Sequence, residues 1–80
     1  MQQATTILLS ELQPSESCTV VSFSNQDQLS TRLLTMGLFP GIRLRVVRNA
    51  PFLDPMEIEV DGAFVCLRRH ESHLIKVTRL

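Results

Sequence analysis

Residues 29–55, LSTRLLTMGLFPGIRLRVVRNAPFLDP, decide the fold, because a helix end, a turn, a strand and a second turn follow one another within them. The apolar residues up to Met36 recur at helical spacing. Gly37 then ends the helix, since glycine adopts the left-handed conformation of a helix C-terminus without a Cβ clash. Pro40 and Gly41 favour a turn. The alternating IRLRVVR that follows is typical of a strand, and the prolines of APFLDP end it, because proline cannot donate to a β-sheet ladder.

The helix before this turn is predicted to run from about Gln26 to Met36. Ser24 or Asn25 can cap its N-terminus, because both side chains accept hydrogen bonds from the first turn of a helix. The apolar face that we expect to pack on the core consists of Leu29, Leu33, Leu34 and Met36.

Further strand signals lie on both sides of this stretch. Residues 18–23 are rich in β-formers and predict the first strand. Residues 56–60 and 63–67 alternate around Asp61-Gly62, a strong signal for a two-residue hairpin. The register of that hairpin pairs Val60 with Ala63, Ile58 with Val65 and Met56 with Leu67. We expect all six residues on the buried face of the sheet. A short polar connection at residues 69–73 leads to the last predicted strand, residues 74–77.

Together these elements predict a mainly β protein, a small five-stranded barrel with one short helix inserted between the first and second strands. The expected core residues are Ile42, Leu44, Val46, Ile58, Val60, Val65 and Leu67. The length of 80 residues fits one domain. We place that domain at residues 7–80, with residues 7–12 supplying apolar side chains beneath it and residues 1–6 disordered.

The composition excludes several function classes. Eight basic and eight acidic residues cancel, so the chain has no bulk attraction for nucleic acid or anionic lipid. No basic N-terminal region precedes a long apolar run, which argues against a signal peptide. We therefore expect a cytoplasmic protein whose two cysteines, Cys18 and Cys66, are free thiols.

We expect neither catalysis nor a bound metal or other cofactor. The glycines fall in predicted turns and form no phosphate-binding loop, and no nucleophile motif is present. The residues that come closest to a metal site are His70, His73 and Cys66, with Glu71 and Cys18 as further candidates. They do not form a set of three or four ligands at recognised spacing, so solvent histidines and small apolar cysteines are the preferred interpretation.

The arginines could form a nucleic-acid patch, the members being Arg43, Arg45, Arg48, Arg68 and Arg69. Single-strand binders interleave such residues with aromatic side chains, whereas this chain has no tyrosine or tryptophan. If the second and third strands pair, Arg43 and Arg45 face Glu57 and Glu59. A solvated charge ladder is the preferred interpretation.

Apolar residues in the two turns predict an interaction surface. Leu38 and Phe39 lie in the first turn, and Phe52 and Leu53 lie between the prolines of the second. A contiguous exposed apolar set marks an interaction site, whereas the competing interpretation is that these residues cap the ends of the barrel. Phe64 adds an aromatic side chain to the outward face of its strand.

The order of these motifs resembles the FeoA family of ferrous-iron transport proteins. The resemblance rests on MGLFPG at residues 36–41, APFLDP at residues 50–55, Leu12-Gln13-Pro14 near the start and Leu67-Arg68-Arg69 before the last strand. It spans residues 9–77. Ser15 and Leu53 stand where the family usually has glycine, and both lie in predicted turns.

The resemblance implies an SH3-like barrel that assists a membrane transporter. It implies a cytosolic accessory protein of ferrous-iron uptake that binds the GTP-binding, cytosolic part of the FeoB transporter and meets the membrane only through that partner. Homo-oligomer formation stays open. The alternatives are a small nucleic-acid-binding barrel and a metal-sensing SH3-like domain.

Overall fold

The structure of the chain is a computed structural model that describes residues 5–23, 27–50, 52 and 54–80. The strands are β1 (Thr6–Leu8), β2 (Ser17–Phe23), β3 (Arg43–Arg48), β4 (Met56–Val60), β5 (Ala63–Leu67) and β6 (Ile75–Arg79). The helical segments are the 3₁₀ turn η1 (Leu9–Glu11), α1 (Asp27–Thr35) and α2 (Arg69–Ser72). The helix α1 lies between β2 and β3, the interval in which the sequence predicted one over residues 26–36.

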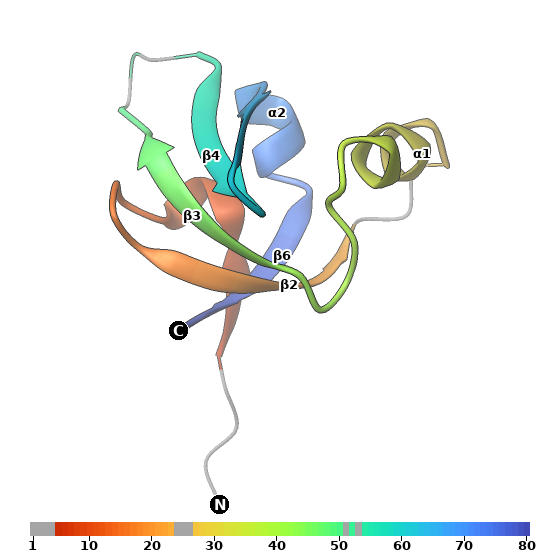
Figure 1. Cartoon of the computed structure of the whole chain (residues 1–80), viewed down its shortest axis with the longest axis horizontal. Helices are drawn as coiled ribbons and strands as arrows, with labels where there is room; N and C mark the ends of the chain where they lie inside the picture. The colour runs from red at the N-terminus through yellow and green to blue at the C-terminus, as the bar shows by residue number, and fades with distance from the viewer. Residues whose placement is uncertain (1–4, 24–26, 51, 53) are drawn as a thin grey trace, which may run out of the picture.

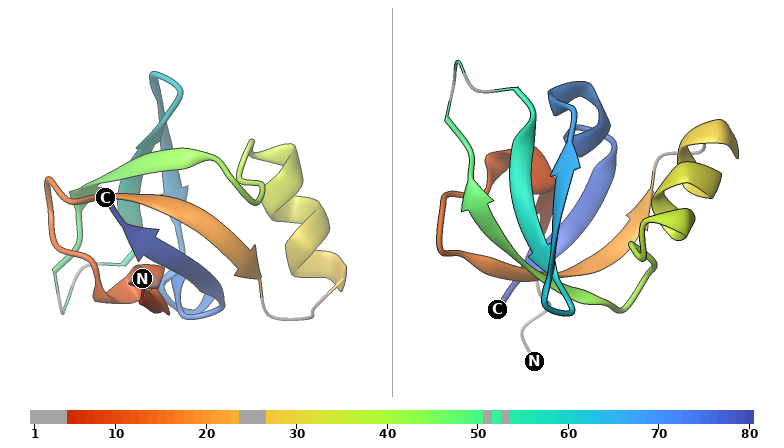
Figure 2. Two further views of the ribbon diagram at one scale, coloured as in Figure 1. Left: turned by 90° about the horizontal axis from the view of Figure 1, so that it is seen from below. Right: turned by 45° about the horizontal axis from the view of Figure 1, so that its top comes forward.

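All strands belong to one antiparallel sheet of six strands in the order β1-β6-β2-β3-β4-β5 (Figure 1). The sheet curls strongly in an SH3-like arrangement (Figure 2). The predicted closed barrel of five strands is corrected in two respects. β1 adds a sixth strand, and across the described residues no register joins the outer strands β1 and β5, so the sheet stays open. β1 escaped prediction because it is only three residues long and pairs with the far end of the chain, Thr6 with Thr78.

The hairpin register is confirmed and the neighbouring one is corrected. β4 and β5 pair Val60 with Ala63 and Ile58 with Val65, as the Asp61-Gly62 turn predicts. Between β3 and β4 the register shifts after Val46. A bulge places two residues of one strand opposite one of the other, so Glu57 faces Arg48 instead of Val47. Arg45 faces Glu59 as expected, but Arg43 is not part of the β3–β4 register, so the expectation that it faces one of these glutamates is wrong.

The core lies inside the curl of the sheet. It comprises Leu9, Leu12, Cys18, Val20, Leu33, Leu38, Leu44, Val46, Met56, Ile58, Val60, Leu67, Ile75 and Val77. Five of the seven predicted core residues are in this set, and Ile42 and Val65 pack against it partly buried. Ala63 is exposed although its face was predicted to be buried. Its strand, β5, is an edge of the sheet and covers less of the core.

The end of α1 follows the predicted glycine signal. Gly37 has a φ of +89°, the Leu38 N–H donates to the Leu33 carbonyl at 2.8 Å, and the Gly37 N–H donates to the Leu34 carbonyl at 3.0 Å. These are the two bonds of a Schellman motif. Leu34, which was predicted to lie on the apolar face of this helix, is exposed, so that assignment is wrong. The predicted caps Ser24 and Asn25 and the side chain of Leu29 lie outside the described part.

Two segments are more ordered or more buried than the sequence suggested. Thr6 belongs to β1 and not to a frayed end. The polar connection before the last strand contains α2, in which Glu71 and Ser72 are buried. Glu71 tolerates burial because its carboxylate meets Arg32 of α1 at 2.6 Å and accepts from the Arg68 N–H at 2.9 Å.

Candidate functional site

Phe52 projects from the loop between β3 and β4 and is fully exposed (relative accessibility 101%). An aromatic side chain in water contributes none of the folding free energy that a buried phenylalanine contributes. Phe52 therefore does not cap the end of the sheet, which was the competing interpretation. Its neighbours Pro51 and Leu53, the latter part of the predicted surface, lie outside the described residues.

Arg69 holds the base of this loop from the start of α2. Its guanidinium donates to Asn49 Oδ1 at 2.9 Å and to the Ala50 carbonyl at 2.7 Å. Its backbone N–H donates to Asp54 Oδ1 at 2.9 Å. One residue thus bonds both sides of the loop, before and after Phe52. The sequence singled out Arg69 as a member of a basic patch and of the Leu67-Arg68-Arg69 motif, but not as a support of this loop, because nothing local links it to a segment about 20 residues away.

Asn49 ties the same base to the N-terminal part of the fold. Its amide donates to the carbonyls of Ser10 at 3.1 Å and of Leu12 at 2.6 Å. Leu12 is fully buried, so the amide rests against the core. We call Asn49, Asp54 and Arg69 the loop frame. Its hydrogen bonds hold the two ends of the loop, at Asn49 and Ala50 and at Asp54, while the Phe52 ring is exposed to solvent.

The predicted surface residues do not form one patch. Leu38 is fully buried and belongs to the core, which corrects its assignment to an exposed surface. Phe39 is 47% exposed but precedes β3, whereas Phe52 follows it. The six residues of β3, at about 3.3 Å each, separate the two aromatic side chains by roughly 20 Å. The proximity expected for Phe39 and Phe52 is therefore wrong.

Phe39 borders a second apolar feature, a hollow of about 300 Å³ beside the β4–β5 turn. The lining residues are Met36, Gly37, Phe39, Ile42, Val60, Asp61 and Ala63. This hollow and the loop of Phe52 lie at opposite ends of β3, so one globular partner would have to span the sheet to touch both.

The candidate metal ligands do not come together within the described chain, where no group of three or more His, Cys, Asp or Glu side chains could hold an ion. His73 shares a hydrogen bond of 2.7 Å with the Ser10 hydroxyl, and Glu71 is bonded to Arg32. His70 and Cys66 are exposed. Cys18 is buried in the core, and burial raises the pKa of its thiol to about 12.

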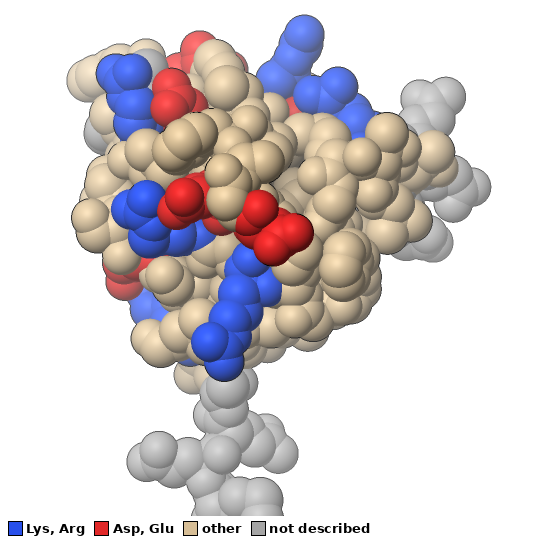
Figure 3. Space-filling view, in the orientation of Figure 1, with Lys and Arg blue, Asp and Glu red and all other residues tan. Residues whose placement is uncertain are grey.

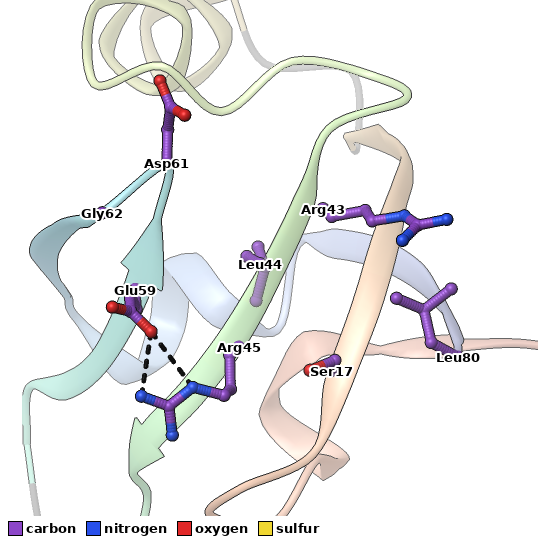
Figure 4. A pocket seen from close by; sticks show the side chains of 8 residues that line it. All are labelled: Ser17, Arg43, Leu44, Arg45, Glu59, Asp61, Gly62 and Leu80. Carbon is purple, nitrogen blue, oxygen red and sulfur yellow. Dashed lines mark hydrogen bonds and ion pairs between the residues drawn. The ribbon is translucent and has the colours of Figure 1, made fainter.

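The outward face of β3 and β4 carries a mixed charge ladder. Arg45 donates to Glu59 at 2.9 and 3.1 Å beside a cavity of about 410 Å³ (Figure 4). Arg48 meets Glu57 at 3.7 Å, while Arg43 forms no ion pair within the described residues. Basic and acidic side chains alternate over the visible face of the molecule (Figure 3). On this face, the basic side chains of the described chain therefore form no extended positive track.

Comparisons with known proteins agree on the family of the chain. The sequence profile of the FeoA domain matches residues 7–79. A crystal structure of an iron uptake regulatory protein, FeoA, superposes with a TM-score of 0.88 at 26% identity, covering 95% of this chain and 100% of the other. The solution structure of the FeoA protein from Chlorobium tepidum gives 0.84 at 35% identity, covering 92% and 70%.

A manganese-dependent transcriptional repressor shares the fold as well. It superposes with a TM-score of 0.88 at 22% identity, and this chain spans 45% of its length. At that identity the likeness concerns the fold alone. Across the described residues, no helix has the length and apolar character needed to cross a membrane.

Proposed function

Because this chain belongs to the FeoA family, we propose that it is a non-enzymatic accessory protein of ferrous-iron uptake. It acts in the cytosol, binds the cytosolic part of the FeoB membrane transporter and modulates the activity or assembly of that transporter. The family match and the FeoA structures support the role in iron uptake.

The observation that carries the binding role is the exposure of Phe52 on a loop whose two ends are held by hydrogen bonds to Arg69. Aromatic side chains dominate the binding energy of many interfaces, since a single ring buries a large apolar area. The loop frame links Arg69 to Asn49 and Ala50 before the ring and to Asp54 after it. A loop whose ends are already held loses less conformational entropy on docking than one with free ends. Phe52 is accordingly the anchor in this proposal, and Leu53 beside it extends the contact.

The mechanism is a shift of populations in the partner. A protein that binds one conformation of the transporter more tightly than another favours that conformation by the difference in binding free energy. In this proposal the energy comes from burying Phe52 against the cytosolic domain. No covalent step and no metal ligand on this chain is required.

The test measures binding of the full chain to the soluble cytosolic domain of the transporter. Phe52→Ser is expected to weaken binding by about tenfold or more, as loss of an aromatic anchor does. Its melting temperature should stay near that of the wild type, because the ring contacts solvent. Leu34→Ser is the matched control, since Leu34 is an exposed apolar residue (53%) on α1, outside the loop. It should bind as the wild type does.

A second variant separates the effect of the hydrogen bonds that hold the loop from the effect of the contact made by Phe52. Arg69→Ala removes the bonds to Asn49 and Ala50 without altering Phe52, and should weaken binding less than Phe52→Ser. Unchanged binding of Phe52→Ser would refute the loop as the contact. Absence of any wild-type binding would refute the transporter as the partner.

A further inference from the structure

β5 is an edge strand whose sequence, AFVCL, carries no charge and no proline. Phe64 is 67% exposed on it, and Ala63 and Cys66 are exposed as well. Natural proteins usually protect such an edge with charged residues, proline or a covering segment, because it offers unpaired backbone groups to other strands. The edge of β5 lacks the first two of these protections.

The turn that starts β5 shows which backbone groups face outward. Asp61 and Gly62 have φ values of +52° and +81°, as in a type I′ turn, which closes a hairpin with the hydrogen-bonded pair Val60–Ala63. Hydrogen-bonded and non-hydrogen-bonded pairs alternate along an antiparallel ladder. Phe64 and Cys66 therefore direct their N–H and C=O groups away from β4, and no other backbone bond in the described chain reaches them.

We propose that β5 pairs antiparallel with β5 of a second copy of this chain, about a two-fold axis at Val65. In this register Phe64 lies opposite Cys66 of the second copy, and Cys66 lies opposite Phe64. Both are outward-facing hydrogen-bonding positions, so each pairing exchanges two N–H···O bonds. The sheet then continues across the axis from one copy into the other.

The occupant is a second copy because the edge is complementary to itself. The register sets the aromatic ring of Phe64 beside the sulfur of Cys66, a favourable contact. It also brings Arg68, extended at the end of β5, to the turn that carries Asp61 of the other copy. Neither Arg68 nor Asp61 forms an ion pair within the described residues. A two-fold interface repeats each of these contacts.

The first experiment follows self-association of the full chain by sedimentation from micromolar to millimolar concentration. We expect a monomer–dimer equilibrium that Phe64→Lys shifts toward monomer by about tenfold or more, because it places a charge opposite an apolar residue on each side of the axis. Leu34→Lys is the matched control on α1 and should associate as the wild type does. Cys66→Lys, at an exposed position, provides a second edge variant.

The second experiment tests the register by disulfide cross-linking. In the proposed register the Val65 Cα atoms are about 4.5 Å apart, while those of Cys66 lie on a diagonal of about 7–8 Å. A disulfide forms readily only below about 7 Å. Under mild oxidation, Val65→Cys in a Cys66→Ser background should therefore cross-link at least as fast as the wild type cross-links through Cys66.

Four results would overturn the proposal. A wild-type chain that stays monomeric up to millimolar concentration has no such interface. Association that survives both Phe64→Lys and Cys66→Lys uses another surface. Rapid cross-linking through Cys66 alone indicates a different register. If the edge variants weaken only binding to the transporter domain, β5 pairs with that partner and not with a second copy.

Discussion

Ser15 occupies a backbone conformation that favours glycine. The Glu16 N–H donates to the Gln13 carbonyl at 3.1 Å, so Pro14 and Ser15 are the central residues of a β-turn. The φ of Ser15 is +76°, which at this position is the signature of a type II turn and normally selects glycine. A hydrogen bond joins the turn to β3, because the Ser15 N–H donates to the Val46 carbonyl at 2.8 Å.

Ser15→Gly is expected to stabilise the chain by about 0.5–1 kcal/mol, because glycine adopts positive φ without a Cβ clash. The measurement is the free energy of unfolding from denaturant titration. Ser15→Ala serves as the control and should give no gain, since alanine keeps the Cβ. Equal stability of the glycine variant and the wild type would mean that serine bears no strain here.

Gly37 tests the same principle in the opposite direction. A Cβ at this position would meet no atom within 4 Å, so the cost of substitution lies in the backbone and not in a collision. Gly37→Val should lower the free energy of unfolding by about 1 kcal/mol or more, and Gly37→Asn by less, because asparagine tolerates the left-handed region. Equal losses in the two variants would argue against this cause.

At the scale of the elements, an ion pair between described residues joins α1 and α2. Arg32 of α1 meets the buried carboxylate of Glu71 in α2 at 2.6 Å. Arg32→Ala leaves that carboxylate buried without its charged partner, which should cost about 1–3 kcal/mol. Arg45→Ala is the control, because its partner Glu59 is more exposed than Glu71 (32% against 6%) and surface pairs contribute about 0–1 kcal/mol.

The comparison of these two variants is made by denaturant unfolding under one set of conditions. A loss for Arg32→Ala no larger than that for Arg45→Ala would show that solvent already screens the Glu71 carboxylate. A larger loss, relieved in the double variant Arg32→Ala, Glu71→Gln, would support an energetic link between α1 and α2.

At the scale of the whole molecule, the two thiols report on different events. Cys66 is exposed and Cys18 is buried in the core. In native buffer a thiol reagent should modify Cys66 rapidly and Cys18 only as the sheet opens, so Cys18 labelling measures the opening free energy. The variant Cys66→Ser removes the rapid reaction, so that the slow labelling of Cys18 can be measured alone. Fast labelling of Cys18 in this variant would show that the core opens locally.

The Cys18 thiol also makes stability depend on pH. Burial raises its pKa from 9.0 to about 12, so the folded state holds the proton more tightly than the unfolded state does. The resulting stability is fully present below pH 9 and is lost as the pH rises from 9 toward 12. Cys18→Ala should flatten the fall of the melting temperature over this alkaline range. An unchanged slope would assign the fall to other groups.

The sequence by itself determined the features that depend on neighbours in the chain. The hairpin register follows from Asp61-Gly62, the end of α1 from Gly37, and the buried face of β3 from the alternation of Leu44 and Val46. Each is fixed by backbone stereochemistry or by a repeat of two residues, which a short stretch contains in full.

Only the tertiary structure decided which distant residues meet. It paired β1 with β6, buried Glu71 against Arg32, set Arg69 beneath the loop of Phe52, and separated Phe52 from Phe39 by the length of β3. These outcomes depend on how the sheet curls and on where a register shifts. Such properties arise when the whole core packs, and so no short stretch of residues encodes them.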